Sequence, residues 1–174
     1  MKGVIAICLS EVVTKRFGAE KWQQILQEAG LPKTAYFLPQ QNVEDAAVLK
    51  VFQATCSVLK LSPMAAAEAF GEYWCCDYAP RIYKAYYSGA RNAKEFLLRM
   101  KDVHDKVTRT IAGARPPVFS YEQPAPNKLI MKYASHRDLG DIFVGLVKGV
   151  GRHFREDLEL HRVGPSVVEV TFAR

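Results

Sequence analysis

RPPVFSYEQPAPNKLIMKYAS, residues 115–135, is the stretch in which the hydrophobic pattern of the chain changes its period. Before it, apolar residues recur at helical spacing, and the two prolines that open the stretch do not continue a helix. After it, Leu129, Met131 and Tyr133 alternate with other residues and share one side of a predicted strand. The chain is therefore predicted to be helical before this stretch and to contain strands after it.

Glycine and proline divide the segment before residue 115 into separate predicted helices. Gly18 and Gly30 each follow a helix, and Pro32 lies beyond the second as a further breaker. Ser62 and Pro63 have the sequence of a helix start, because serine is a good N-cap and proline suits the first helical position. Six helices are expected, at residues 2–17, 19–29, 43–60, 63–76, 80–88 and 91–111.

The segment after residue 115 alternates strands with one glycine-rich helix. Turn residues separate the strands at 124–127 and at Gly164-Pro165. The predicted elements are strands at 118–123 and 128–135, a helix at 138–154, and strands at 158–163 and 167–172. The predicted fold class is α+β, an N-terminal helical part followed by a four-stranded antiparallel sheet with one or two packed helices. The 174 residues fit a single domain.

Composition excludes several classes of protein. The net charge is +6, but the basic residues are scattered with no run of five, which argues against nucleic-acid binding. No apolar run approaches the length of a membrane span, so no membrane association is expected. The cysteines form no C-x-x-C pair, which argues against a zinc site or a thioredoxin-type pair, and free thiols fit a reducing cytoplasm. They are Cys8, Cys56, Cys75 and Cys76.

His104 is the first candidate for a functional side chain. It lies on the apolar stripe of the predicted helix 91–111 and not on the charged face. A neutral imidazole in an apolar pocket can ligate iron, and a proximal histidine commonly holds haem. A core histidine bonded to backbone is the alternative. The stripe consists of Phe96, Leu97, Met100, Val103, Val107 and Ile111.

Tyr133, Ser135 and Arg137 form a second candidate group at the end of a predicted strand. Their spacing of two places all three on one face. A phenol, a hydroxyl and a guanidinium together suit a carboxylate ligand, which arginine can engage with two hydrogen bonds, and haem carries two propionates. An exposed, polar strand end without a ligand is the alternative.

Further motifs extend these two groups over nearly the whole chain. In chain order they are Met1-Lys2-Gly3, Phe17-Gly18, Trp22, Phe70-Gly71-Glu72-Tyr73-Trp74, Met100-Lys101-Asp102-Val103-His104, Arg115-Pro116-Pro117, Tyr133-Ala134-Ser135-His136-Arg137 and Asp141-Ile142-Phe143-Val144-Gly145-Leu146. This ordered set resembles the H-NOX family, the haem nitric oxide/oxygen-binding domains that include the sensor domain of soluble guanylate cyclase. A single tyrosine-x-serine-x-arginine motif would be weak, but the ordered set is strong.

The resemblance implies a role for each matching position. His104 would be the proximal ligand of haem b iron, Tyr133, Ser135 and Arg137 would bind its propionates, and Pro117 would press on the haem and distort it. Haem would lie between a distal helical part, at about residues 1–63, and a haem-holding part with the sheet, at about residues 64–174. The positions expected to line the distal pocket are Ile5, Leu9, Trp74, Tyr78, Ile142 and Leu146.

The resemblance also bears on the gas. Oxygen-binding members of the family have a distal tyrosine that donates a hydrogen bond, and here that position is occupied by Ile142. Because nitric oxide needs no such donor, we expect nitric oxide and carbon monoxide to bind and dioxygen to be discriminated against. Trp74 and Tyr78 could reach the pocket, although aromatic core packing is the stronger expectation for both. A Tyr78 hydroxyl directed at the iron would weaken the oxygen prediction.

The chain contains no cyclase or kinase motif, so we expect a sensor and not an enzyme. The resemblance implies a cytoplasmic, bacterial sensor that releases its proximal histidine and so regulates a separate histidine kinase, a cyclic-di-GMP enzyme or another signalling protein. Some relatives bind zinc through three cysteines and a histidine near the C-terminal sheet, but no cysteine follows Cys76 here. The alternatives are a haem-dependent oxygen sensor, a weak haem peroxidase, and a haem-free module that binds an anion.

Overall fold

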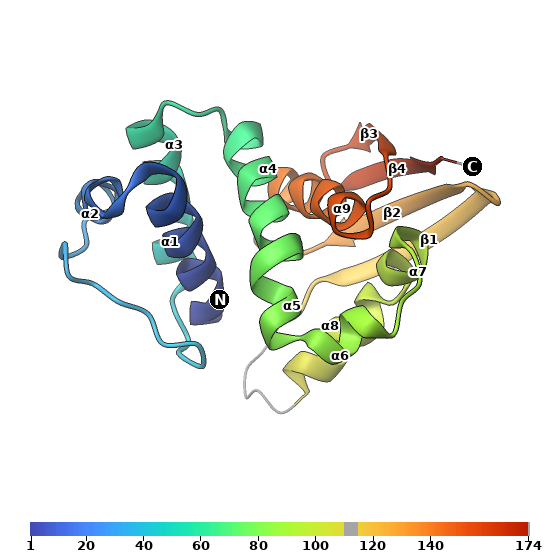
Figure 1. Ribbon diagram of the computed structural model, residues 1–174, viewed down its shortest axis with the longest axis horizontal. Coiled ribbons are helices and arrows are strands. Elements are labelled where there is room, and N and C mark those ends of the chain that lie inside the picture. The colour runs from blue at the N-terminus through green and yellow to red at the C-terminus, as the bar shows by residue number, and fades with distance from the viewer. Residues whose placement is uncertain (110–114, 174) are drawn as a thin grey trace.

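The computed structural model describes residues 1–109 and 115–173. Three helices form the N-terminal helical part, which occupies one end of the molecule in Figure 1. They are α1 (Gly3–Phe17), α2 (Ala19–Glu28) and α3 (Asp45–Leu59). Their apolar faces meet in a core that includes Val13, Ile25, Leu26 and Val51. These three helices agree with the sequence prediction to within two residues.

A long helical column follows and runs between the helical part and the sheet (Figure 1). It begins with α4 (Pro63–Tyr73), where the Ser62 hydroxyl accepts a hydrogen bond from the Ala65 amide at 3.1 Å, as expected for an N-cap. The column then continues as the π-helical turn η1 (Trp74–Tyr78) and α5 (Ala79–Ile82). A break at Tyr83 precedes α6 (Lys84–Ser88), so the helix expected at 80–88 is divided.

The single helix expected at 91–111 is wrong. The chain forms α7 (Ala93–Leu98) and α8 (Met100–Thr108), separated at Arg99, whose amide donates to the Phe96 carbonyl in a tighter turn. The two helices have different packing partners, because α7 packs against the helix after β2 whereas α8 contacts β1. Residues 110–111 of the expected helix lie outside the described residues.

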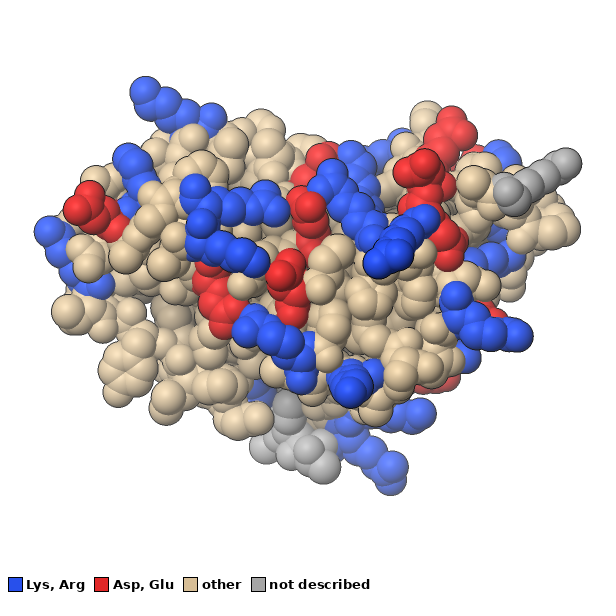
Figure 2. Space-filling model, in the orientation of Figure 1, with Lys and Arg blue, Asp and Glu red and all other residues tan. Residues whose placement is uncertain are grey.

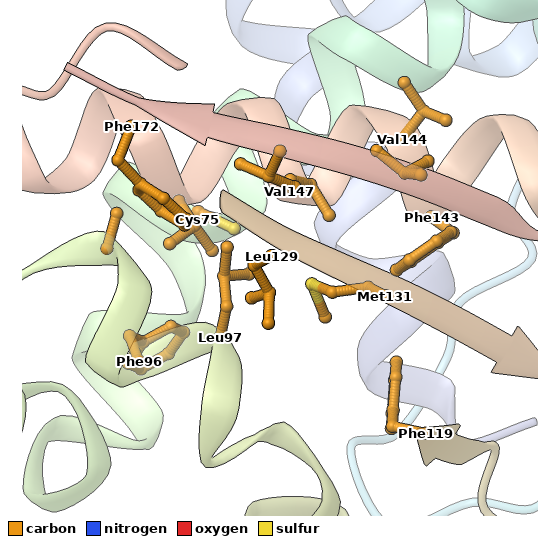
Figure 3. Close-up of a cluster of buried hydrophobic side chains, with 14 of the residues drawn as sticks. Cys75, Phe96, Leu97, Phe119, Leu129, Met131, Phe143, Val144, Val147 and Phe172 are labelled. Atoms are coloured by element: carbon orange, nitrogen blue, oxygen red, sulfur yellow. The ribbon is translucent and has the colours of Figure 1, made fainter. Parts of the chain in front are cut away.

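The sheet is antiparallel throughout, with strand order β1-β2-β4-β3. Its strands are β1 (Val118–Ala125), β2 (Lys128–Ala134), β3 (Leu158–Gly164) and β4 (Val167–Phe172), and α9 (Gly140–Phe154) lies between β2 and β3 in sequence. Leu129 and Met131 of β2 are buried against Val147 of α9 in the second core (Figure 3). The α+β architecture predicted from the sequence is therefore confirmed.

Helix α9 attaches the column to the sheet through a close backbone contact. A Cβ atom built on Gly145 would lie 2.2 Å from the Ala67 carbonyl oxygen, and one on Gly71 would lie 2.1 Å from the Gly145 carbonyl oxygen. Only glycine permits this approach. The glycine-rich sequence of α9 therefore serves helix–helix packing.

Ion pairs reinforce the same junction on the surface. Glu72 of α4 pairs with Arg16 of α1 at 3.2 Å and with Arg152 of α9 at 2.5 Å. Figure 2 shows basic and acidic side chains interspersed on this face, without a continuous basic stripe. Within residues 1–109 and 115–173, no helix has the length and apolar character needed to cross a membrane.

Substitution of Gly145 by alanine should destabilise the protein. Overpacking against rigid backbone costs about 1–3 kcal/mol, and commonly exceeds the roughly 1 kcal/mol that alanine gains over glycine inside a helix. Urea denaturation followed by circular dichroism should show a lower unfolding midpoint for Gly145→Ala.

Gly164→Ala is the control, because the nearest atoms to its built Cβ belong to the Val167 side chain at 3.8 Å. Its stability should stay within about 0.5 kcal/mol of the unmodified protein. Equal stabilities for the two variants would show that the α4–α9 contact does not require glycine.

Candidate functional site

A cavity of about 720 Å³ lies between the helical part and the sheet part. Its wall is mostly apolar and is built from every described helix except α2, from strands β1 and β2, and from the segment before β1. Cavities of about 300–1,000 Å³ with few polar groups are typical of cofactor and small-molecule sites. The polar groups that line it are therefore the candidates for ligand binding.

His104 of α8 lines this cavity. Its Nδ1 lies 2.7 Å from the Met100 carbonyl oxygen, which makes Nδ1–H the donor and leaves the Nε2 lone pair available. Burial lowers the pKa of His104 and outweighs the opposing effect of that hydrogen bond, so the imidazole is neutral at neutral pH. A neutral imidazole with an orienting backbone contact is a good metal ligand.

The apolar stripe of α8 has an unexpected environment. None of the residues of α8 is fully buried, although the sequence places Met100, Val103 and Val107 on one face with His104. These residues all line the cavity. The α8 part of the predicted stripe therefore faces a cavity, whereas Phe96 and Leu97 belong to α7 and the packed core, and Ile111 lies outside the described residues.

The group Tyr133, Ser135 and Arg137 is only partly assembled as expected. Strand β2 ends at Ala134, so only Tyr133 lies on the strand, and the expectation that all three share one strand face is wrong. The chain turns immediately after the strand, and the Ser135 hydroxyl accepts a hydrogen bond from the Arg137 amide at 3.3 Å. Tyr133 and Arg137 line the cavity, whereas Ser135 does not.

Arg137 is held by two segments that are distant in sequence. Its Nε donates to Asp45 Oδ2 of α3 at 2.7 Å, and its Nη1 donates to the Arg115 carbonyl oxygen at 3.0 Å. Asp45 also lines the cavity and was not anticipated from the sequence. An aspartate in the first turn of a helix is ordinary, so no local pattern identifies it.

The remaining predicted positions lie mostly in the cavity wall. Pro117, which precedes β1, lines the wall. The other lining residues are Ile5 and Leu9 of α1, Trp74 of η1, and Ile142 and Leu146 of α9. Tyr78 does not line the cavity. Its ring stacks on Trp74 at a centroid distance of 5.5 Å and is buried with the helical core. Aromatic packing, the stronger expectation, thus describes Tyr78, whereas Trp74 borders both cores and the cavity.

The donor set fits haem. The cavity offers an apolar wall for a macrocycle, a neutral imidazole that can ligate iron, and a fixed guanidinium that can bind a carboxylate. The described residues contain no cluster of three or more histidine, cysteine or acidic side chains that could hold a separate metal ion.

Comparison with known proteins agrees with this geometry. A family model described as Haem-NO-binding matches residues 2–162. The soluble guanylate cyclase gcy-37 of Caenorhabditis elegans is 27% identical over 156 residues, which are 87% of this chain and 22% of that protein. The chain therefore spans about a fifth of the length of this curated relative.

Solved structures share the whole fold at low sequence identity. An H-NOX protein from S. oneidensis in the Fe(II)NO ligation state superposes with a TM-score of 0.88 at 16% identity, covering 100% of each chain. An oxygen-binding H-NOX domain related to soluble guanylate cyclases, in its oxygen complex, superposes with a TM-score of 0.86 at 22% identity, covering 100% of this chain and 96% of that one.

The two neighbours differ in the gas that they hold, so the shared fold alone does not choose a gas. The family match, by contrast, covers far more than half of the chain. Because the family model matches residues 2–162 and the fold is shared, the chain belongs to the Haem-NO-binding family of H-NOX domains.

Proposed function

We propose that this domain binds haem b and senses nitric oxide. The observation that carries the proposal is the neutral His104 imidazole, whose Nδ1 is fixed by Met100 in a cavity with Arg137 at its edge. Bound haem would supply a ferrous iron at which diatomic gases bind. Residues of about 1–63 would form the distal part and those of about 64–174 the haem-holding part.

The residues of the wall divide the task of holding the cofactor. His104 would provide the axial ligand, Arg137 and Tyr133 would bind the propionates, and Pro117 would press on the macrocycle. Ser135 would contribute indirectly, because its hydroxyl contacts the Arg137 amide in the turn after β2. The distal positions Ile5, Leu9, Ile142 and Leu146 are aliphatic and supply no acid–base pair, which favours a sensor over a peroxidase.

The distal wall favours nitric oxide and carbon monoxide over dioxygen. Dioxygen bound at ferrous haem accumulates negative charge and gains from a hydrogen-bond donor, whereas nitric oxide binds without one. Ile5, Leu9, Ile142 and Leu146 provide only aliphatic groups there. This apolar wall is the basis for the proposed discrimination against dioxygen.

The output would pass through α8. No residue of this helix is fully buried, and its Lys101 amide donates to the Tyr121 hydroxyl of β1 at 3.2 Å. Release of His104 would therefore remove a main tether of α8. We propose that the resulting change regulates a signalling protein in the cytoplasm, such as a histidine kinase or cyclic-di-GMP enzyme of the bacterial kind; the four free thiols suit that compartment.

A dioxygen sensor is the second candidate, and Trp74 is the observation that favours it. Trp74 lines the cavity, and its indole N–H is a hydrogen-bond donor. If that N–H reaches the bound gas, it would supply the donor that Ile142 cannot provide.

Replacement of His104 by glycine should abolish proximal ligation. We expect His104→Gly to be isolated with little haem unless free imidazole is present, and to regain the five-coordinate ferrous absorption spectrum when imidazole is added. His161→Gly on the exposed strand β3 is the control and should behave like the unmodified domain. An unchanged axial coordination in His104→Gly would contradict the assignment.

Introduction of a tyrosine at Ile142 should raise the affinity of the haem-loaded domain for dioxygen. A hydrogen bond to a charged group contributes about 1.5–3 kcal/mol, which corresponds to roughly tenfold or more in affinity. Stopped-flow dissociation rates of dioxygen should fall in Ile142→Tyr and stay unchanged in Ile142→Phe, which has the ring without the hydroxyl. Equal rates in both variants would place residue 142 away from the gas.

Trp74→Phe separates the two candidate gases. If the domain is a nitric oxide sensor with an apolar distal wall, this variant should leave the dioxygen affinity within a factor of about two, because no hydrogen bond is lost. A tenfold loss of dioxygen affinity, with unchanged nitric oxide affinity, would identify Trp74 as a donor and favour the oxygen sensor.

A further inference from the structure

Asp45 is the centre of an ion-pair cluster at the edge of the cavity. It lies in the first turn of α3, where the helix dipole favours a negative charge. Its Oδ2 accepts from Arg137 Nε at 2.7 Å and lies 3.1 Å from His136 Nε2, and its Oδ1 accepts from the Met1 nitrogen at 2.5 Å. The cluster thus connects the helical part with the turn after β2.

The carboxylate is ionised at every physiological pH. Burial alone would raise the pKa of Asp45, but hydrogen bonds from the Met1 nitrogen, His136 and Arg137 outweigh that effect and hold it at about 2. Arg137 therefore always faces an acceptor with a full negative charge. The pair is mostly shielded from solvent, with 16% of the Arg137 side chain and 29% of the Asp45 side chain exposed.

Two anchors determine the plane of the Arg137 guanidinium. Asp45 engages Nε, and the Arg115 carbonyl oxygen engages Nη1. The hydrogen bonds from Arg137 to described residues use Nε and Nη1 and not Nη2, and the side chain lines the cavity. A guanidinium fixed in this way presents its remaining donors to a ligand without the entropy cost of ordering a free arginine.

We propose that Asp45 is a positioning residue for the acid groups of the cofactor, which it helps to bind by holding Arg137 in place. The assignment rests on the proposed binding of a porphyrin dicarboxylate in this cavity. It makes the helical part a contributor to carboxylate recognition, although the residues that would touch the carboxylates belong to the sheet part. Loss of a group that orients a metal ligand typically costs about 10–100-fold in metal affinity, and we take the lower end of that range for a group that orients a carboxylate-binding arginine.

The physical alternative is that Asp45 lowers the affinity for an acidic ligand. A carboxylate near the binding site also repels an acidic ligand, and if repulsion dominates, removal of Asp45 would strengthen binding. The same alternative predicts that Asp45→Asn behaves like Asp45→Ala, because both lack the charge. Positioning predicts a difference between these variants, since the asparagine amide oxygen can still accept from Arg137 Nε.

The test uses the haem-free domain and metal-free protoporphyrin IX, whose binding is followed by fluorescence and does not depend on iron, His104 ligation or gas. Asp45→Ala should bind the dicarboxylic acid about tenfold more weakly and its dimethyl ester with unchanged affinity. Asp45→Asn should retain most of the affinity for the acid. In an Arg137→Gln background, Asp45→Ala should have no further effect, because the residue through which it acts is gone.

Asp141→Ala is the matched control. Asp141 is likewise an aspartate in the first turn of a helix, and it pairs with Arg162 at 2.6 Å, but neither residue lines the cavity. Its affinity for both porphyrins should equal that of the unmodified domain.

Three results would overturn the assignment. Tighter binding of the acid by Asp45→Ala would show that repulsion dominates, and an equal loss for acid and ester would show a general effect on folding. A further loss in the Arg137→Gln background would show that Asp45 acts independently of Arg137. Failure of the unmodified domain to bind either porphyrin is a separate result, which would remove the proposed function and this assignment with it.

Discussion

The close backbone contact between α4 and α9 is the constraint on which the rest of the structure depends. Carbonyl oxygens of one helix occupy the space that Cβ atoms would need on the other, at Gly71 and at Gly145. This contact fixes the helical column against the sheet, so that the column contributes side chains to both cores. Phe70 faces the core of α1–α3, whereas Cys75 belongs to the core under the sheet. The cavity lies where these two cores separate.

The cavity explains why α8 differs from the other helices. A helix with an apolar stripe ordinarily buries that stripe against protein, and the burial stabilises its position. In α8 the stripe lines a cavity, and its main contacts with other described elements are with α7 and β1. The position of this helix is therefore more sensitive to the contents of the cavity than that of α4 or α9. That sensitivity is what a sensor requires at its input.

The two polar features of the cavity make opposite electrostatic demands. Burial lowers the pKa of His104 and favours its neutral imidazole, which the proposed role of iron ligand requires. Arg137 lies at the partly exposed edge and is paired there with Asp45. Placing both in one fully buried site would leave the cation with a large desolvation cost. The cavity separates them by reaching from the apolar interior to the surface.

Local sequence was sufficient for most of the architecture. The change of hydrophobic period at residues 115–135, the glycine and proline breakers and the Ser62 cap predicted the α+β order, and the observed strands begin and end within two residues of their expected positions. The break at Arg99 was not predicted, because it arises from the different packing partners of α7 and α8 and not from a breaker residue. Periodicity also placed His104 on an apolar stripe, and the ordered motifs indicated Tyr133, Arg137 and the aliphatic wall.

Tertiary structure alone decided what those residues face and which partners they have. Period-two spacing cannot show that β2 ends at Ala134, so Ser135 and Arg137 were wrongly given a shared strand face with Tyr133. It cannot distinguish Trp74 in the cavity wall from Tyr78 behind it, because both are aromatic residues of the same helical column. Asp45 could not be found at all, since its partner Arg137 is 92 residues away in sequence. Hydrophobic periodicity predicts which residues share a face of a helix or strand, whereas tertiary contacts determine what packs against that face.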